Sequence, residues 1–407
     1  MNTTEVAVTG AGAVSPAGTG ADALWKALAD GTSLAVTDPN LAGMAVDFSC
    51  RVPEFDADAL LGRRLSWRLD RFTHLALVAA REAVTDAALD PTDWDAARVA
   101  VVLGVGSNSL QHYDATFDHI RQGRLQKISP LMIPRSAPNV VAGEIAMDLR
   151  ATGPNFTTSS ACASGTTAIG VARDLLRSGA CDIAITGGTE SGRTPAAAAG
   201  FWRMRARSER VGDPRSASRP FDAARDGFVL SEGAGVLVLE RATDARARQA
   251  RIRGYLIGYG ASTDAHHFTA PHPEGDGAVQ AMRTALRDAA LEPGDIGQVN
   301  AHGTSTPHND LAENVALRRV FGSPPPVTAN KGVLGHTLGA AGALEAIATL
   351  LSLEHQLIPP TANLERLDPA IDLDVVAGVP RPVRMAAAVS NSFGFGGQNA
   401  VLVLRAA

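Results

Sequence analysis

One cysteine in a stretch of small residues has the surroundings that a catalytic thiol needs. Cys162 lies in Ser-Ser-Ala-Cys-Ala-Ser-Gly-Thr-Thr at 159–167, between a β-branched run at 155–158 and a helical pattern of apolar residues from 168 to 176. This pattern predicts a strand, a tight turn and a helix. The helix dipole at such a turn favours the thiolate, and the backbone N–H groups of the turn can hold an oxyanion. Cys162 is therefore a candidate nucleophile, with a buried structural cysteine as the alternative.

Two histidines follow predicted strands, in loops rich in glycine and threonine. His302 lies in Asn-Ala-His-Gly-Thr-Ser-Thr-Pro at 300–307, and His336 ends Asn-Lys-Gly-Val-Leu-Gly-His at 330–336. A third loop, Asn-Ser-Phe-Gly-Phe-Gly-Gly at 391–397, has glycines that let backbone approach a ligand closely. Ligands bind at the C-terminal ends of strands in open α/β sheets, so these loops are expected to meet. Either histidine alone is equally well explained as structural, but two histidines and a cysteine in such loops indicate nucleophilic catalysis.

Alternating strand and helix patterns must position these loops, and they predict an α/β fold with helices on both sheet faces. The order of elements is similar in 1–245 and 252–407, which indicates two related halves without a repeat at the residue level. The segment 107–138, rich in Gly, Pro and Ser, is expected to cap the site or to contact a second subunit. Helices are predicted at 21–30, 71–89, 139–147, 277–290, 310–321 and 337–353. Further strands are predicted at 6–9, 100–104, 183–188, 236–239, 254–260, 297–301, 327–329, 372–376, 386–390 and 400–404.

The glycines after the first strand match a dinucleotide-binding loop only in part. Gly10-Ala11-Gly12 is followed by Ser15 where the third glycine of that fingerprint belongs, and then by Pro16. No acidic residue ends a second strand about 20 residues further on. We therefore expect no nucleotide site here.

Composition excludes several classes of protein. The 407 residues are 45% hydrophobic and 19% charged, and the net charge of −5 argues against general nucleic-acid binding. The sequence has neither an apolar run long enough for a membrane span nor the pattern of a signal peptide. Three cysteines, Cys50, Cys162 and Cys181, make neither a disulfide framework nor a metal-ligand cluster, so we expect a cytoplasmic protein with no metal. Among 37 basic residues only Lys26, Lys127 and Lys331 are lysines, so these positions are candidates for needing a compact ammonium.

From Val6 to Leu404, the sequence resembles the elongating β-ketoacyl-acyl-carrier-protein synthases, and the cysteine, two histidine and Gly-Phe-Gly-Gly motifs carry the resemblance. Thiolases have a second cysteine, and initiating synthases an asparagine, at the position of the second histidine. The resemblance implies a thiolase-like fold of two βαβ-rich halves in α-β-α-β-α layers. It also implies a decarboxylative Claisen condensation of malonyl-acyl carrier protein with a Cys-bound acyl chain, in type II polyketide or fatty-acid biosynthesis. The alternative is a non-catalytic, chain-length-factor-like subunit, which would have lost Cys162.

The resemblance also assigns roles to individual residues. Cys162 would take the acyl group from the phosphopantetheine of the carrier protein, and no cofactor is implied. His302 and His336 would stabilise the malonyl-derived enolate. Lys331 would be the family's catalytic lysine, with Glu313 as the acidic residue that pairs with it. Phe395 would gate the acyl pocket and provide an oxyanion-hole N–H together with that of Cys162. The remaining assignments are two pantetheine-binding hydroxyls, Thr304 and Thr306, and four carrier-docking arginines, Arg63, Arg64, Arg68 and Arg205.

Two departures from the family pattern lie near the pocket or the docking face. Gln398 stands where many fatty-acid synthases of this type have threonine, and Trp202-Arg203-Met204-Arg205 is bulkier and more basic than usual. They leave the chain length, the starter unit and the pathway open. The resemblance further implies a homodimer, or a heterodimer with a chain-length-factor-like subunit, and neither a nucleic-acid nor a membrane partner.

Overall fold

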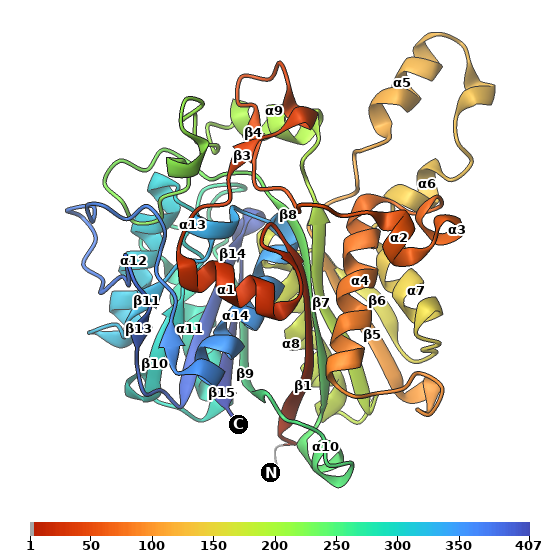
Figure 1. Cartoon of the computed structure of the whole chain (residues 1–407). Coiled ribbons are helices and arrows are strands. Elements are labelled where there is room, and N and C mark those ends of the chain that lie inside the picture. Colours follow the sequence, from red (N-terminus) through yellow and green to blue (C-terminus); the bar gives the residue numbers. More distant parts are fainter. Residues whose placement is uncertain (1–3) are drawn as a thin grey trace.

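The computed structural model describes residues 4–407, and its central feature is a mixed sheet of eleven strands (Figure 1). One short strand, β2 (Gly18–Thr19), pairs only with β1, and the other ten form a single row. In order across the sheet these are β11 (Val327–Thr328), β10 (Ile296–Asn300), β14 (Ala387–Gly394), β15 (Gln398–Ala406), β9 (Gly254–Thr263), β1 (Val6–Ser15), β8 (Glu232–Arg241), β7 (Ile183–Ser191), β5 (Val99–Val105) and β6 (Asn155–Thr158).

The row consists of two five-stranded parts with the same pairing pattern. In the first part β6, β5 and β7 are parallel, and β8 and β1 continue the sheet in antiparallel fashion. In the second part β11, β10 and β14 are parallel, and β15 and β9 are antiparallel. The parts join where Val6–Val8 of β1 pairs with Gly254–Leu256 of β9. The similarity of the two halves is therefore one of topology.

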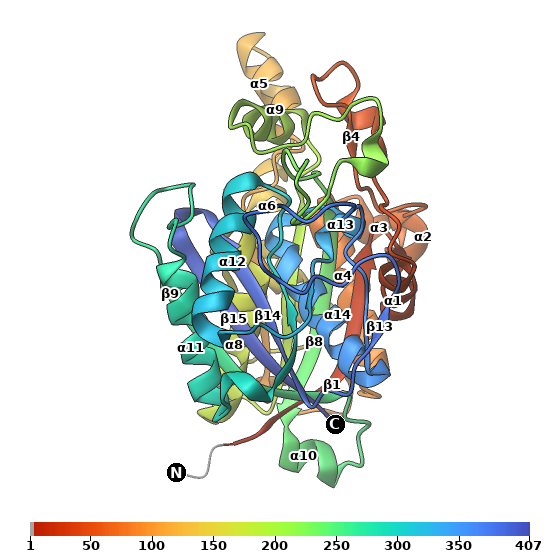
Figure 2. The ribbon, with the colours of Figure 1, turned by 90° about the vertical axis from the view of Figure 1, so that its left-hand side faces the viewer.

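Helices form three layers around the two parts of the sheet (Figures 1 and 2). One outer layer, α4 (Arg71–Asp86) and α7 (Asn139–Asp148), shares an apolar cluster with β5, β7 and β8. The other, α11 (Asp276–Ala289) and α12 (Pro307–Phe321), packs on β10, β14 and β15. Between the parts lie α8 (Ser164–Arg177) and α14 (Ala341–His355), whose cluster includes residues of β1, β8 and β15. These are the predicted α-β-α-β-α layers.

The segment 107–138 is more ordered than the sequence predicted. It forms α5 (Tyr113–Arg121) and α6 (Met132–Ser136), and α5 projects from the body of the molecule (Figure 1). Its apolar side chains are poorly covered, with Leu125 61% and Ile133 66% exposed. The shorter helices outside this segment are α1 (Ala21–Asp30), α2 (Ala57–Leu61), α3 (Arg63–Ser66), α9 (Pro195–Arg203), α10 (Ala242–Ala247) and α13 (Lys331–Leu334).

Most predicted strands are a few residues shorter than those of the structure, and the first strand and one C-terminal strand need separate comment. The strand predicted at 6–9 continues to Ser15, and its glycines serve packing, since a Cβ on Gly12 would lie 2.0 Å from the Ala79 carbonyl oxygen of α4. The strand predicted at 372–376 is wrong, because only Val375 forms an isolated bridge there, to Val327. Across residues 4–407, no helix combines the length and the apolar character that crossing a bilayer requires.

Candidate active site

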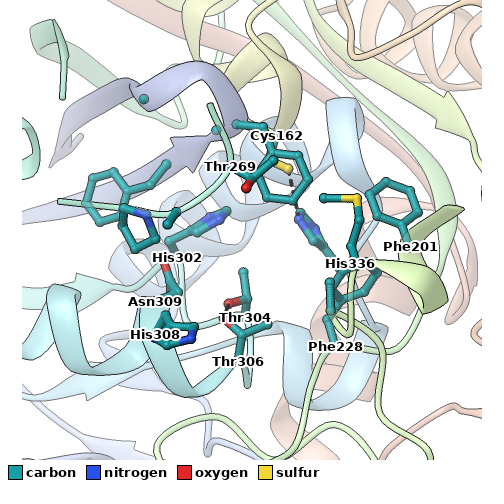
Figure 3. A pocket seen from close by; sticks show the side chains of 18 of the residues that line it. Cys162, Phe201, Phe228, Thr269, His302, Thr304, Thr306, His308, Asn309 and His336 are labelled. Atoms are coloured by element: carbon teal, nitrogen blue, oxygen red, sulfur yellow. Dashed lines mark hydrogen bonds between the residues drawn. The ribbon is translucent and has the colours of Figure 1, made fainter. Parts of the chain in front are cut away.

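Cys162 lies in the predicted turn between β6 and α8. A single 3₁₀ turn, Ala161–Ala163, carries the cysteine, and α8 begins at Ser164. The Sγ atom is buried and lies 3.1 Å from Nε2 of His336 (Figure 3). The glycine-rich 391–397 loop packs directly on this turn, since a Cβ on Gly394 would lie 2.5 Å from the Ser160 carbonyl oxygen. The sequence therefore predicted correctly that the cysteine, the second histidine and the glycine-rich loop meet.

The protonation state of the thiol differs from the sequence-based expectation. Burial raises the pKa of Cys162 to about 12, although the Lys331 charge and a hydrogen bond from the Phe395 N–H act in the opposite direction. The helix dipole was expected to favour the thiolate, but loss of hydration outweighs it at a site that is only 8% exposed. In the unliganded site the thiol is therefore neutral near pH 7.

Both histidines direct an Nε2–H group into the pocket. The Leu338 N–H donates to Nδ1 of His336 over 3.3 Å, and Nζ of Lys331 lies 3.3 Å from Nδ1 of His302. A nitrogen that accepts such a bond carries no proton in a neutral ring, so the proton of each imidazole is on Nε2. The rings lie at 83° with centroids 5.5 Å apart (Figure 3). Two donors therefore converge on the space beside the thiol.

The electrostatic surroundings keep both rings neutral. Burial lowers the pKa of His302 well below its ordinary value, and the Lys331 charge and the neighbouring His336 ring lower it further. Burial and Lys331 act in the same way on the pKa of His336. At neutral pH the two rings are consequently uncharged hydrogen-bond donors.

Lys331 occupies a closed polar cluster behind His302. Its ammonium donates to the His302 carbonyl oxygen over 2.6 Å and forms a close ion pair with Glu345 of α14. With the contact to Nδ1 of His302, all three N–H bonds of the ammonium have acceptors. Such complete pairing is what a buried charge requires, and burial raises the pKa of Glu345 while Lys331 lowers it.

The predicted pairing of Lys331 with Glu313 is wrong. Glu313, on α12, accepts the backbone N–H groups of His302 and Gly303 over 2.9 and 2.8 Å, and the Asn391 amide over 3.2 Å. It therefore fixes the backbone of the first histidine loop, and Glu345 is the partner of the lysine. Sequence did contain a signal for Glu345, because it is the one charged residue between 337 and 353 in an otherwise apolar helix.

Two cavities meet at Cys162. The first has a volume of about 190 Å³ and is lined by Cys162, both histidines and the predicted pantetheine residues Thr304 and Thr306, whose hydroxyls lie 2.8 Å apart (Figure 3). The second, of about 170 Å³, continues past the cysteine; other residues that line it are Ser107, Glu190, Ala197, Phe201, Leu338 and Phe395.

Phe395 lines both cavities, as a residue at their junction must. Sequence analysis did not single out Glu190 or Phe201 of the second cavity. Glu190 accepts the Gly106 N–H over 2.8 Å, and burial raises its pKa to about 8. Its position at the end of a predicted apolar strand was the only signal available. The two cavities give a thioester a path in on one side of the thiol and room for a chain on the other.

The four predicted docking arginines are not brought together in one chain. Arg63, Arg64 and Arg68 lie on and just after α3, whereas Arg205 follows α9 and lines the first cavity. Figure 1 places α3 at the side of the molecule and α9 at the top. Arg68 is also paired with Glu144 over 2.5 Å, which compensates its charge. All four remain exposed, so a partner can reach them.

A cysteine between two cavities, with two Nε2–H donors beside it, defines a class of enzymes that acylate a thiol and stabilise an enolate in a thiolase-like fold. The family described as Beta-ketoacyl synthase, N-terminal domain, matches residues 3–245, and the corresponding C-terminal domain matches 253–365. The chain belongs to the β-ketoacyl synthase family.

Individual relatives agree with this assignment over the whole chain. The 3-oxoacyl-[acyl-carrier-protein] synthase 2 of Synechocystis sp. is 41% identical, with 98% of this chain and 97% of that protein covered. Among solved structures, "The ishigamide ketosynthase/chain length factor" is 35% identical with a TM-score of 0.94 and complete coverage of both chains. One chain of the AntDE:AntF structure, described as a type II PKS acyl-carrier protein in complex with its ketosynthase, is 30% identical with a TM-score of 0.87. The match covers all of this chain and all of that one.

Proposed function

We propose that this β-ketoacyl-acyl-carrier-protein synthase uses Cys162 as its nucleophile and His302 and His336 as its enolate-stabilising donors. The observation that carries the proposal is the 3.1 Å contact of Sγ with an imidazole whose tautomer is fixed by the Leu338 N–H. Thr304 and Thr306 hold the pantetheine arm in the first cavity, and the second cavity takes the acyl chain. Lys331 acts as a positioning residue, because it contacts His302 and lies outside both cavities.

In the first half-reaction the Cys162 sulfur attacks the carbonyl carbon of an acyl-pantetheine thioester. The new C–Sγ bond forms, the bond to the pantetheine sulfur breaks, and the thiol proton is transferred in net terms to the departing sulfur. The backbone N–H groups of Cys162 and Phe395 hold the tetrahedral oxyanion. Acylation replaces a neutral thiol by a neutral thioester, so the buried site gains no charge.

In the second half-reaction malonyl-carrier protein enters the first cavity. The bond between its carboxylate and Cα breaks, CO₂ leaves, and the electron pair moves to the thioester as an enolate. His302 and His336 donate their Nε2–H bonds to the enolate oxygen, which is where charge develops. The enolate carbon then attacks the acyl carbonyl and displaces the Cys162 sulfur, which takes up a proton from water. Every step uses groups of this chain, so the proposal invokes no metal or organic cofactor.

The assignment of the halves follows from this scheme. We propose 1–245 as the half that carries the nucleophile and 252–407 as the half that carries the two histidines. The free state of Cys50, Cys162 and Cys181 supports a cytoplasmic location. The intact cysteine and its histidine contact favour a catalytic subunit over a chain-length-factor-like one.

We further propose that the chain functions as a dimer, either with an identical copy or with a related subunit that lacks the cysteine. The exposed apolar side chains of the 107–138 segment, among them Phe117, Ile120 and Ile133, support a subunit contact there. Light scattering at micromolar concentration should give about twice the 42.1 kDa chain mass. An active monomer would exclude the dimer, and activity only after coexpression with a homologue would identify the heterodimer.

The experiment that tests the reaction is acylation followed by intact-protein and peptide mass spectrometry. Incubation with an acyl-carrier protein should add one acyl mass, located on the peptide that contains Cys162. Addition of malonyl-carrier protein should then remove that mass and release a β-ketoacyl product two carbons longer. Acylation that persists in Cys162→Ala would refute the assignment.

A further inference from the structure

The second cavity, which the proposed function gives to the acyl chain, has an apolar and a polar set of lining residues. The apolar set comprises Leu110, Ala161, Ala197, Phe201, Leu338 and Phe395. The polar set comes mainly from one stretch of chain, in which Glu190 and Ser191 end β7 and Thr194 precedes α9. The polar residues 107–109 also line the cavity, but they begin the proposed subunit contact, where a second chain can bond them. In a pocket that is otherwise apolar, a few polar groups fix the orientation and the identity of the ligand.

The two hydroxyls of this stretch have hydrogen-bonding capacity that the chain does not use. Oγ1 of Thr194 accepts the Ala197 N–H over 3.3 Å as the N-cap of α9, so its own O–H remains available as a donor. The Ser191 side chain forms no hydrogen bond within residues 4–407, and both side chains are partly buried. An acyl chain that fills the cavity displaces water from these hydroxyls. Each O–H then needs an acceptor on the chain itself.

The carboxyl group of Glu190 adds polarity to the cavity without adding charge. It is 3% exposed and accepts the Gly106 N–H over 2.8 Å, and burial raises its pKa to about 8. Near pH 7 this group is therefore neutral. A chain that ended in a carboxylate or an ammonium group would find no opposite charge among the residues that line the cavity. Neutral oxygen atoms are consequently the polar groups that this cavity suits.

We propose that the second cavity selects acyl chains that carry neutral oxygen atoms, as keto or hydroxyl groups, over saturated chains of the same length. Ser191 and Thr194 donate their O–H groups to these oxygens, while the apolar residues of the cavity pack against the carbon atoms. The proposal rests on the proposed function, which places the acyl chain in this cavity. A site whose polar groups bond a substrate oxygen discriminates against the analogue that lacks it, because those groups are then left without partners.

The test compares hexanoyl, 3-oxohexanoyl and 5-oxohexanoyl chains on the same acyl-carrier protein, so that docking is equal for all three. Six carbons suit a cavity of about 170 Å³, since an engineered cavity of about 150 Å³ holds a six-carbon ring. The rate of Cys162 acylation at limiting substrate, followed by intact-protein mass spectrometry, gives the preference among the chains. At least one oxo chain should acylate the wild type roughly tenfold faster than hexanoyl.

Substitutions separate the effect of the hydroxyls from the intrinsic reactivity of a keto thioester. Ser191→Ala combined with Thr194→Val should reduce the preference for the oxo chain about tenfold, in part by speeding acylation with hexanoyl, because no O–H group is then left without a partner. Thr194→Ser retains both the hydroxyl and the cap of α9, so it should retain the preference. Ser178→Ala is the matched control, at an exposed serine after α8 that lines neither cavity, and it should change nothing.

Two results would overturn the proposal. One is a wild type that hexanoyl acylates as fast as both oxo chains or faster, and the other is a preference that persists undiminished without the two hydroxyls. If the double variant does not fold, Ser191→Ala alone replaces it, because this change leaves the α9 cap intact and should lower the preference by a smaller factor. A wild type that none of the three carrier-linked chains acylates would instead refute the proposed function itself.

Discussion

The two halves of the chain share a topology, yet their equivalent loops carry opposite kinds of chemistry. In the first half, β6 leads to α8 through the short segment 159–163, whose only titratable group is Cys162. In the second, β11 leads to α14 through 329–340, which contains Lys331 and His336. One crossover thus supplies an uncharged nucleophile, and its counterpart supplies a cation and a donor. The reaction centre exists only where the two halves meet.

This division has a physical advantage for a two-step reaction. The thiol has to react in a buried site whose neighbouring groups are uncharged. The enolate needs hydrogen-bond donors that do not themselves become charged. Lys331 lies behind His302, outside the cavities, and its charge is paired with that of Glu345. For both reasons its ammonium does not attract the malonyl carboxylate directly. Placing these groups on separate halves allows the two half-reactions to be tested independently.

Removal of the thiol should give the largest effect and should affect only the function of the first half. Cys162→Gln is expected to lower condensation by a factor on the order of 10⁴ or more, to the background rate. Malonyl decarboxylation should continue, because its donors His302 and His336 are intact. CO₂ release and β-ketoacyl product, measured in the same sample, check both statements. Loss of both activities would mean that the halves are not separable.

Removal of a histidine should produce the converse result. His302→Ala or His336→Ala is expected to reduce decarboxylation by a factor on the order of 10² to 10³, the usual cost of one oxyanion donor. His302→Ala should still be acylated at Cys162, since of the two histidines it is His336 that contacts Sγ. Single-turnover acylation followed by mass spectrometry is the measurement. Normal decarboxylation by His336→Ala would show that its Nε2–H does not serve the enolate.

The sequence was informative about these groups to different degrees. That Cys162, His302 and His336 lie around one cavity could be predicted, because glycine-rich loops after apolar strands have a recognisable pattern and strand ends meet at one edge. The Lys331 partner was predicted incorrectly, since Glu313 and Glu345 lie on different helices and only three-dimensional packing decides which faces the ammonium. The thiol pKa was also misjudged, because a local dipole can be inferred from sequence whereas the extent of burial cannot.

The pKa values predict a pH dependence of intermediate size. Since the Cys162 pKa is raised to about 12, the thiolate fraction should rise about tenfold with each pH unit between 7 and 10. Alkylation of Cys162 by iodoacetamide, located by peptide mapping, should follow this slope without a plateau. Decarboxylation should stay flat from about pH 6 to 8, because both histidines, whose pKa values are lowered, are already neutral. An alkylation plateau below pH 8 would show that the thiolate is stabilised after all.

The smallest effect should come from charge reversal at the exposed arginines, which only attract the carrier protein and take no part in the reaction. Arg205→Glu is expected to raise the apparent KM for carrier-linked substrate a fewfold and to weaken its salt dependence, because rim charges act mainly on association. Arg68→Glu is a less direct test, since it would also repel Glu144 across a 2.5 Å ion pair. Arg384→Glu, the same change at an exposed residue close to β13 (Arg381–Pro382), is the matched control and should have no effect.

A small pantetheine thioester separates docking from chemistry. Every variant should use it as the wild type does, since this substrate has no acidic surface that the arginines could attract. Equal losses on both substrates in Arg205→Glu would mean that Arg205, which also lines the first cavity, acts on the pantetheine arm and belongs to the chemistry of the site.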